Sequence, residues 1–360
     1  MSSPSYNRGE WAELYVLTKV LCDQTLQVRV HGDTSATKSL SVQQIKRGYE
    51  SAAESYSIQG YEVICDHTSK KVLRTEIGSH VIEFLRSIKR GSGISFPLVE
   101  GDEILELLDI SQLKQGSHHK SDIYIDVVDP LTGTTGVQGY TIKALIGSKP
   151  TLFNASEPTN LTFQIDPPMS SNEIAEYNKR NADEKLIHGI RNTSAKILES
   201  GHTMTLKTMD KRFKENLELL DSKMPEFIAE VVLAYYSRKV GKATSIKKTI
   251  AYLCNSNPLR VSNPEHWYPH KIKDFLEASA YGMTPTDPYN GERTAAGGLL
   301  LVEKNGEINC FRLDDKDKTR DYLIEHTYFE TASRDKHHFG EILESGKETF
   351  LKLNLQIRYK

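Results

Sequence analysis

The 360-residue chain lacks long apolar runs, paired cysteines and an excess of either charge. No run approaches the roughly 20 apolar residues of a membrane span. The first ten residues do not show the charged and then apolar pattern of a signal peptide. The four cysteines are far apart and form no Cys-x-x-Cys pair, which is typical of reduced thiols rather than of a zinc site or a disulfide framework. We therefore expect a cytoplasmic protein that does not enter a membrane.

The overall charge gives no sign of nucleic-acid binding. Lysine and arginine total 46, aspartate and glutamate total 48, and the net charge is −2. A DNA-binding role would therefore need locally clustered cations. The length, with 38% hydrophobic and 26% charged residues, suits one large domain or two to three ordinary domains with a well-formed core.

The most informative pattern is a predicted antiparallel hairpin between residues 121 and 145. Residues 121–129 alternate polar and apolar side chains, which indicates a half-buried strand, and 137–145 read as a second strand after a turn rich in proline and glycine. Asp122 begins the first strand and Lys143 lies within the second. Because side chains alternate between the two faces of a strand, Thr141 shares a face with Lys143.

A carboxylate and an ammonium group at one end of a hairpin can hold a divalent cation and polarise a phosphate. This combination is what a metal-dependent nuclease requires. The alternative is a surface hairpin with scattered charges, because an aspartate and a lysine at this spacing occur in most soluble chains.

A second candidate acidic site lies in a predicted amphipathic helix at residues 8–21. Asn7 can serve as its N-cap, and Glu10, three residues later, completes the pattern of a capping box. Glu13 lies on the same side of that helix as Glu10. The alternative is a solvated acidic first turn, which the helix dipole favours in any case.

The remaining patterns indicate a mixed α/β (α+β) protein. Residues 24–75 are rich in strand-forming residues, with a short helix expected at 42–51. Further helices are expected at 77–90, 101–109, 170–180, 184–200, 209–221, 224–240, 245–254 and 271–283. Asn305-Gly306 between two apolar runs predicts a hairpin over 297–313, and 351–359 alternate as one terminal strand. We expect a core over 1–165, a helical region over 166–285 and a β-rich segment over 286–360.

Several of these segments together resemble the HpaII-type restriction endonucleases. The segments are 7–15, 120–130 with 139–160, the hairpin at 297–313, and 352–358; the helical middle is similar too. The resemblance spreads over most of the chain and is least visible at 25–115. The order and spacing of several long motifs are far more specific than one pair of residues.

The resemblance implies a PD-(D/E)xK nuclease core, in which a central mixed sheet is flanked by helices. In such cores a helix glutamate, a strand aspartate and a hairpin lysine surround Mg²⁺. The aspartate and the lysine carry over to Asp122 and Lys143. The chain departs from the broad pattern, because Ser121 replaces the proline and Thr141 replaces the second acid. The missing carboxylate is then expected from the first helix, with Glu13 preferred over Glu10.

The resemblance also implies an activity. It is Mg²⁺-dependent hydrolysis of double-stranded DNA at a short palindromic site, for which CCGG is the best single guess. Asp122, Glu13, Lys143 and Thr141 are the expected catalytic group. A palindrome suits a two-fold homodimer, and a methyltransferase of the same specificity is the expected genetic partner in a bacterial or archaeal host. Two alternatives stay open: a DNA-binding protein on an inactive nuclease core, and a repair or junction-resolving nuclease.

Residues that contact DNA are expected in three polar segments. The candidates are Lys149, Asn154, Ser156 and Asn160 in the loop 148–160, Arg334, Lys336, His337 and His338 in the basic loop 331–340, and Gln356 and Arg358, beside Asn354, on one face of the terminal strand. Amide and cationic side chains can contact base edges or phosphates. For each segment the alternative is a turn or strand face that only meets solvent.

Overall fold

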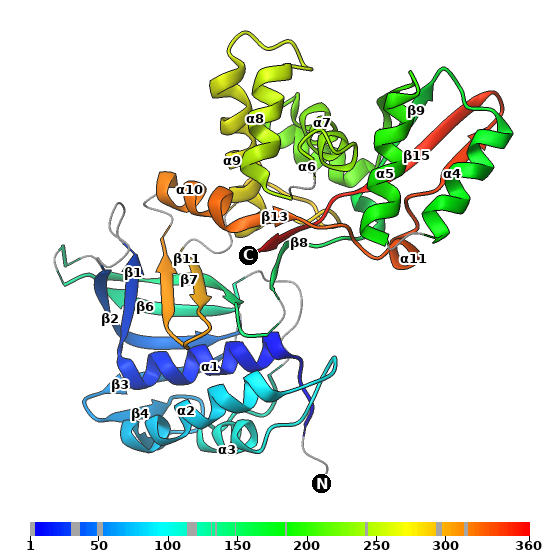
Figure 1. Ribbon diagram of the computed structural model, residues 1–360. Coiled ribbons are helices and arrows are strands. Elements are labelled where there is room, and N and C mark those ends of the chain that lie inside the picture. Colours follow the sequence, from blue (N-terminus) through cyan, green and yellow to red (C-terminus); the bar gives the residue numbers. More distant parts are fainter. Residues whose placement is uncertain are drawn as a thin grey trace. The chain divides into compact units, whose positions relative to one another are not determined.

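The computed structural model describes residues 4–29, 37–48, 53–113, 121–130, 132–133, 135–147, 149–183, 186–241, 244–292, 297–312 and 316–360. Its fold is mixed α+β, as expected (Figure 1). The chain divides into two compact units, Met1–Pro150 with Arg293–Thr319, and Thr151–Glu292 with Arg320–Lys360. The units cut across the three consecutive segments expected from the sequence, because the hairpin near residue 305 joins the sheet of the first unit.

A nine-stranded mixed sheet forms the centre of the first unit. Its strands are β1 (Thr25–Arg29), β2 (Thr37–Arg47), β3 (Glu54–Gln59), β4 (Glu62–Cys65), β5 (Lys70–Leu73), β6 (Ile123–Val128), β7 (Thr135–Ala144), β11 (Gly298–Val302) and β12 (Ile308–Phe311). Their order is β1-β12-β11-β7-β6-β2-β3-β4-β5. The pairs β1–β12 and β11–β7 are parallel, and the other neighbours are antiparallel.

The sheet closes on itself at one end. β1 pairs with β12 and also with the first half of β2, while the second half of β2 pairs with β3. Each neighbouring pair from β1 through β12, β11, β7 and β6 to β2 is therefore hydrogen-bonded in a ring. Within this ring, β7 pairs with β11 and β6 pairs with β2. The hairpin that carries Asp122 and Lys143 is therefore held by a neighbouring strand on each side.

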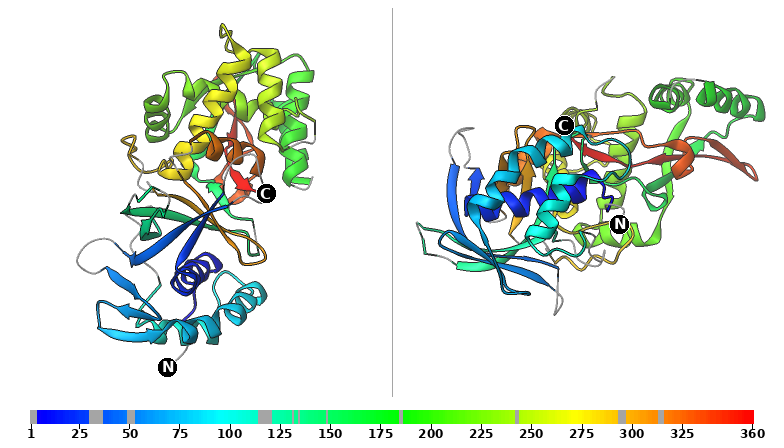
Figure 2. Two further views of the ribbon diagram at one scale, coloured as in Figure 1. Left: turned by 90° about the vertical axis from the view of Figure 1, so that its left-hand side faces the viewer. Right: turned by 90° about the horizontal axis from the view of Figure 1, so that it is seen from below.

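Three helices pack together on this unit: α1 (Arg8–Asp23), α2 (Arg74–Arg90) and α3 (Val99–Leu107). Figure 2 shows α1 beside both the strands and the other two helices, and its closest strand neighbours are β7 and β2. The buried face of α1 includes Trp11, Leu14, Tyr15 and Leu21, which join one hydrophobic core with side chains such as Ile125 of β6. Full burial of such a side chain contributes about 1.5–3 kcal/mol to the free energy of folding.

The hairpin of β6 and β7 follows the local signals in its sequence. Along β6 the side chains alternate between buried and half-buried, as the period of two predicted. The antiparallel register pairs Ile123 with Tyr140 and Val128 with Thr135. The turn contains Gly133 at a φ of 68°, a conformation that side chains with a Cβ rarely adopt.

The second unit contains most of the helices. They are α4 (Ser171–Asp183), α5 (Leu186–Glu199), α6 (Lys211–Leu220), α7 (Met224–Tyr236), α8 (Ile246–Ser256), α9 (Pro264–Tyr281), the last part of α10 (Lys316–His326), α11 (Arg334–His337) and the 3-10 turn η1 (Glu157–Thr159). One sheet has the order β10-β9-β15-β14, from Thr203–Met209, Asn160–Asp166, Glu348–Asn354 and Ile342–Ser345. A smaller sheet has the order β13-β16-β8, from Thr327–Phe329, Ile357–Tyr359 and Thr151–Phe153.

Most elements expected from the sequence are confirmed, with five differences. A strand, β2, replaces the short helix expected at 42–51, because its residues pair with β3 and β6. The strand β10 follows α5 where only helices were expected. Helix α9 begins at Pro264 rather than at 271, and α7 ends at Tyr236 rather than at 240. The terminal strand is divided into β15 and β16, which belong to different sheets.

Two expectations from composition can be compared with the structure. Cys22, Cys65, Cys254 and Cys310 are all unpaired thiols. Within the described ranges, no helix has the length and the apolar character needed to cross a membrane.

Candidate active site

Asp122 is held at the start of β6 by its partner strand. Its backbone N–H donates to the Tyr140 carbonyl at 2.9 Å. Its Oδ2 accepts from the Ile142 N–H at 2.5 Å and from the Thr141 hydroxyl at 3.1 Å. Both side-chain bonds end on Oδ2, so Oδ1 is the oxygen that can face a cation. The carboxylate is thereby oriented by β7 itself.

Thr141 is a buried residue that contacts the candidate metal ligand directly. It occupies the position where the resemblance leads one to expect a second acid. Its hydroxyl donates to Asp122 instead of supplying a carboxylate. Such a bond restricts the rotation of the Asp122 carboxylate. Thr141 is therefore placed as a positioning residue.

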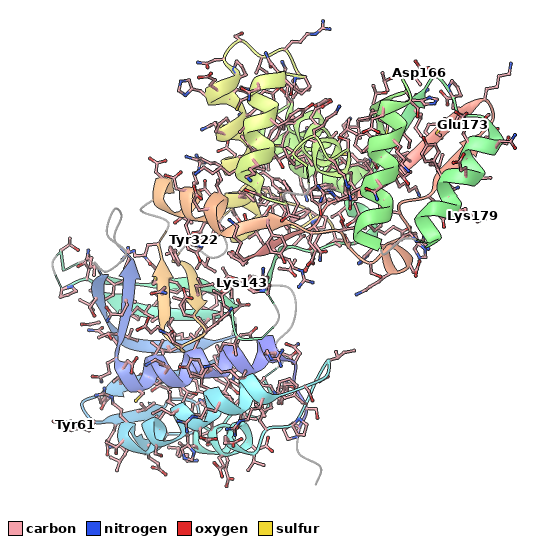
Figure 3. The ribbon with its side chains drawn as sticks, in the orientation of Figure 1. Tyr61, Lys143, Asp166, Glu173, Lys179 and Tyr322 are labelled. Atoms are coloured by element: carbon pink, nitrogen blue, oxygen red, sulfur yellow. The ribbon has the colours of Figure 1, made fainter. Side chains whose placement is uncertain are left out.

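Lys143, which is labelled in Figure 3, lies two residues further along β7 than Thr141. Because side chains alternate between the two faces of a strand, the two residues share a face. Lys143 is half-buried, and it is paired in register with Leu301 of the parallel strand β11. Leu301 is fully buried. Because β7 has hydrogen-bonded neighbours on both sides, the backbone that carries Lys143 has little freedom to shift.

Glu13 reaches this region from α1. The half-buried side chain follows the buried pair Trp11 and Ala12. The pKa of Glu13 is raised from an ordinary value of 4.5 to about 8, first by burial of the carboxyl group and then by the negative charge of Asp122. The positive charges of Lys143 and Arg47 act in the opposite direction. Glu13 therefore lies within electrostatic range of both the aspartate and the lysine that the sequence singled out.

Glu10 has another contact. Its Oε2 accepts from the Asn7 N–H at 2.7 Å, while Asn7 Oδ1 accepts from the N–H groups of Gly9 and Glu10 at 2.8 and 3.0 Å. The capping box expected from the sequence is confirmed. Glu10 is close enough to raise the pKa of Glu13 slightly, but its carboxylate is engaged at the helix end. This geometry favours Glu13 as the acid that faces Asp122.

Arg47 is a buried cation near the site that the sequence did not reveal. It ends β2, forms an ion pair with Glu54 at 2.6 Å and donates to the Leu113 carbonyl at 3.1 Å. Its charge lowers the pKa of Glu13. The segment was expected to be helical, so nothing in the pattern suggested that Arg47 would lie on a strand beside β6.

The helix that carries Glu13 is anchored on two sides. Trp11 Nε1 donates to the Phe96 carbonyl at 3.0 Å, and the Tyr15 hydroxyl donates to the Gly306 carbonyl at 2.8 Å. Gly101 of α3 lies against the Trp11 ring so closely that a Cβ there would come within 2.3 Å of it. Gly306 belongs to the turn of the β11–β12 hairpin, so α1 is tied both to the helices and to the sheet.

These groups form a site with two carboxylates and one ammonium. No group of three or more histidine, cysteine, aspartate or glutamate side chains that could hold a metal is present in the described ranges. Two carboxylate ligands are nevertheless what Mg²⁺ commonly takes, since it keeps several waters and adds oxygens from a phosphate substrate. The mutual repulsion of Glu13 and Asp122 is the electrostatic condition that a bound cation relieves.

Comparison with known proteins shows the family of the chain. The family model for the HpaII restriction endonuclease matches residues 7–359. The chain is 35% identical to the type II restriction enzyme HpaII of Haemophilus parainfluenzae over 370 residues, covering 99% of this chain and 98% of the relative. The chain belongs to the HpaII restriction endonuclease family. It is thus a type II restriction endonuclease, as the sequence motifs predicted. No solved structure matches it.

The loop after the hairpin of β6 and β7 carries four of the expected DNA-contacting residues of this HpaII-family enzyme. Ser148, the first residue of the loop, lies outside the described residues. The chain passes from the first unit to the second within the loop, so Lys149 belongs to the first unit and Asn154 to the second. Both side chains are exposed. Their contact with DNA stays a prediction.

Two other residues of that loop have partners inside the second unit. Asn160 is buried, donates to the His337 carbonyl at 2.7 Å and accepts from Asn354 at 2.6 Å. The Ser156 carbonyl accepts from Asn354 at 2.9 Å, and the Ser156 N–H donates to the Thr159 hydroxyl at 3.0 Å. Asn354 is itself buried and joins this network rather than a surface. Asn160 is therefore placed as a structural residue, not as one exposed to DNA.

The basic segment 331–340 contains the short helix α11. Lys336 and His338 are exposed, while Arg334 and His337 are half-buried. Arg334 contacts its neighbour Asp335 at 3.3 Å. Burial and the neighbouring Lys336 and His338 lower the pKa of His337, which favours its neutral form. A groove of about 230 Å³ lies beside Arg334 and His338, so a phosphate or groove contact here stays a prediction.

The terminal strand has fewer polar side chains available for DNA than the alternation of its sequence suggested. Arg358 forms an ion pair with Glu330, and Gln356 is half-buried between the ends of β15 and β16. The expected apolar face is confirmed, because Leu351, Leu353 and Ile357 are fully buried. A contact of Arg358 with DNA would have to compete with Glu330.

Proposed function

We propose that this HpaII-family enzyme hydrolyses phosphodiester bonds of double-stranded DNA with Mg²⁺ as cofactor, and that Glu13, Asp122 and Lys143 form its catalytic centre. One observation carries the proposal. Asp122, which directly precedes β6, and Lys143 of β7 both lie within electrostatic range of Glu13, which comes from the distant helix α1. An acid pair beside an ammonium group is the arrangement on which metal-dependent phosphodiester hydrolysis depends.

The residues present fit a magnesium ion. Asp122 offers Oδ1 while Thr141 and the Ile142 N–H hold its Oδ2. Glu13 offers a second carboxylate. Burial and the charge of Asp122 raise its pKa, so a bound cation would stabilise its charged form. When bound, Mg²⁺ would neutralise charge on the phosphate and on the leaving 3′-oxygen and would lower the pKa of a coordinated water.

The protein's own groups then have separate tasks. Asp122 and Glu13 hold the cation and lose their mutual repulsion. Lys143 binds the same phosphate, orients the attacking water and stabilises the negative charge that develops in the transition state. Thr141 keeps Asp122 in the required rotamer. Arg47, which is buried, favours the charged form of Glu13.

This assignment supports a variant of the PD-(D/E)xK core. The acid that the broad pattern places two residues before the lysine is replaced by Thr141, and Glu13 from α1 restores the number of carboxylates. Such a core is consistent with the nine-stranded sheet, which mixes parallel and antiparallel strands and has the proposed catalytic hairpin at its centre. The two strands adjacent to the hairpin are β2 and β11.

The substrate is proposed to be a short palindrome. CCGG is the best single candidate, because the relative that shares 35% identity is the type II enzyme HpaII. A palindrome is matched most simply by a homodimer with two-fold symmetry. A methyltransferase that modifies the same site would protect the DNA of the host, in whose cytoplasm the enzyme is expected to act.

Cleavage of plasmid DNA tests the proposal. Purified enzyme with Mg²⁺ should convert a sequenced plasmid into discrete fragments whose ends all map to one sequence, and EDTA should stop the reaction. A branched junction without that sequence should remain intact. Specific binding without cleavage would instead identify an inactive nuclease core, and cleavage of branched DNA alone would identify a junction-resolving enzyme.

A further inference from the structure

A second polar groove lies in the helical part of the second unit, among residues that no sequence motif singled out. It has a volume of about 720 Å³ and lies where α7 and α9 begin. Lys223, Arg260, His266, Trp267 and Lys273 are among its lining residues. In Figure 1, α8 and α9 run side by side, and Arg260 lies in the connection between them.

The lining carries more positive than negative charge. Lys223, Arg260 and Lys273 are cationic, and Glu265 is the one carboxylate among the lining residues. Lys273 is paired with Asp321 at 2.6 Å. Lys223 and Arg260 are exposed, and neither forms an ion pair with another described residue. The groove therefore presents two exposed cations to an anionic ligand. Asp221 lies within electrostatic range of Lys223 and accepts from its backbone N–H at 2.7 Å, so such a ligand would compete with Asp221 for Lys223.

In the absence of a ligand, cations at these positions are electrostatically unfavourable for the two helices that begin here. Lys223 is the N-cap of α7, and Arg260 precedes the N-terminus of α9, where the helix dipole already supplies partial positive charge. Neither Lys223 nor Asn263, the N-cap of α9, caps its helix with a side-chain hydrogen bond. An anion in the groove would offset both the cations and the helix ends.

An indole ring completes the groove. Trp267 is half-buried and packs edge-to-face against Phe227, with ring centroids 5.6 Å apart and an interplanar angle of 90°. It also contacts Tyr268 edge-to-face. Lys271 Nζ lies over the ring, 5.8 Å from its centroid. The part of the indole that remains exposed is therefore an apolar surface with cations beside it. Alternating charge and apolar surface is the chemistry of a sugar–phosphate backbone.

We propose that this groove binds the backbone of duplex DNA independently of base sequence, with Lys223 and Arg260 contacting phosphates. The inference rests on the proposed function, and it adds a backbone-binding surface to the base-reading segments expected elsewhere. Phosphate contacts position a protein on DNA without carrying sequence information. The groove would thus increase affinity for all duplexes to the same degree.

The test is the salt dependence of DNA binding without Mg²⁺. The double variant Lys223→Ala/Arg260→Ala is compared with the wild type on a duplex that contains CCGG and on a scrambled duplex. Each lost phosphate contact lowers the slope of log K against log salt concentration by about 0.9, so the slope should fall by about two for both duplexes. The double variant Lys179→Ala/Lys347→Ala is the matched control, because both lysines are exposed residues of the same unit outside the groove, and its slope should stay unchanged; Lys179 is shown in Figure 3.

Fluorescence of the wild type gives a second readout. The chain has two tryptophans, and Trp11 is fully buried, so acrylamide quenching reports mainly on Trp267. Either duplex should protect Trp267 from acrylamide. An unchanged salt slope in the groove variant, or a loss confined to the CCGG duplex, overturns the proposal. If that result comes with normal plasmid cleavage by the wild type, the proposed function stands; if the wild type neither binds nor cleaves DNA, both fail.

Discussion

Replacing Glu13 by glutamine should stabilise the metal-free protein, and increasingly so as the pH rises. Folding raises the pKa of Glu13 from 4.5 to about 8, so between these values the folded chain holds a proton that the unfolded chain releases. The free energy of unfolding therefore decreases with rising pH through this window. Glutamine does not titrate, so Glu13→Gln removes that loss.

The magnitude follows from the size of the pKa change. Each pKa unit is worth 1.36 kcal/mol, so a change from 4.5 to about 8 corresponds to at most about 5 kcal/mol. Glu13 is half-buried rather than enclosed, and water screens part of the repulsion, so we expect roughly 1.5–2.5 kcal/mol. The variant should equal the wild type near pH 4.5 and exceed its stability by that amount near pH 8.5.

Urea unfolding in EDTA measures this difference. In a Trp267→Phe background the fluorescence of Trp11 follows the first unit, to which Glu13 belongs. Glu10→Gln is the control, because it removes a carboxylate from the same helix while glutamine can keep the capping box. Glu10 has the smallest effect on the pKa of Glu13, so the stability difference of this variant should change far less between pH 5.5 and 8.5 than that of Glu13→Gln. A Glu13→Gln difference that is constant between pH 5.5 and 8.5, or that reverses sign, would refute the reasoning.

Three further outcomes follow from the geometry. Thr141→Ala should retain substantial single-turnover cleavage, losing about 0.5–1.5 kcal/mol or roughly tenfold, because it removes one hydrogen bond to Asp122. A Thr141→Ala enzyme without activity would contradict this positioning role and show that the hydroxyl holds a required water or ligand. Thr141→Glu should be poorly active with Mg²⁺, since it adds a third carboxylate to the site, and full activity of that variant would contradict this statement. Glu13→Gln should lose far more cleavage rate than Glu10→Gln, and the reverse ranking would transfer the metal-binding role to Glu10. Tyr15→Phe should lower the free energy of unfolding of the first unit by about 1–3 kcal/mol, because the Gly306 carbonyl loses its buried donor; an unchanged urea midpoint would show that α1 is not tied to the β11–β12 turn in this way.

The catalytic hairpin and the first helix could be predicted because their signals are local. The alternation of residues 123–128, the glycines of the turn and the capping box of Asn7 and Glu10 all act within a few residues. Local signals also predicted that Glu13 and Asp122 belong to a helix and a strand. That the two carboxylates approach each other depends on the packing of α1 beside β7 and β2, which only the family resemblance suggested.

What the sequence could not provide depends on partners far away in the chain. Residues 42–51 have a pattern compatible with a helix, yet β2 forms because β6, some 80 residues later, hydrogen-bonds to it. Asn160 resembled a surface residue of a polar loop, but Asn354 buries it from the other end of the chain. The groove beside Trp267 combines two helix starts that no motif connects.

The central claim, that Glu13, Asp122 and Lys143 form one catalytic centre, is tested most directly by single-turnover cleavage of a site-containing duplex. Asp122→Asn, Glu13→Gln and Lys143→Met are measured beside the wild type, with binding of the same duplex measured without Mg²⁺. We expect Asp122→Asn to abolish cleavage and the other two variants to lose at least about a hundredfold, or 2.7 kcal/mol, while all three still bind the duplex. Near-normal cleavage by Asp122→Asn would contradict the account.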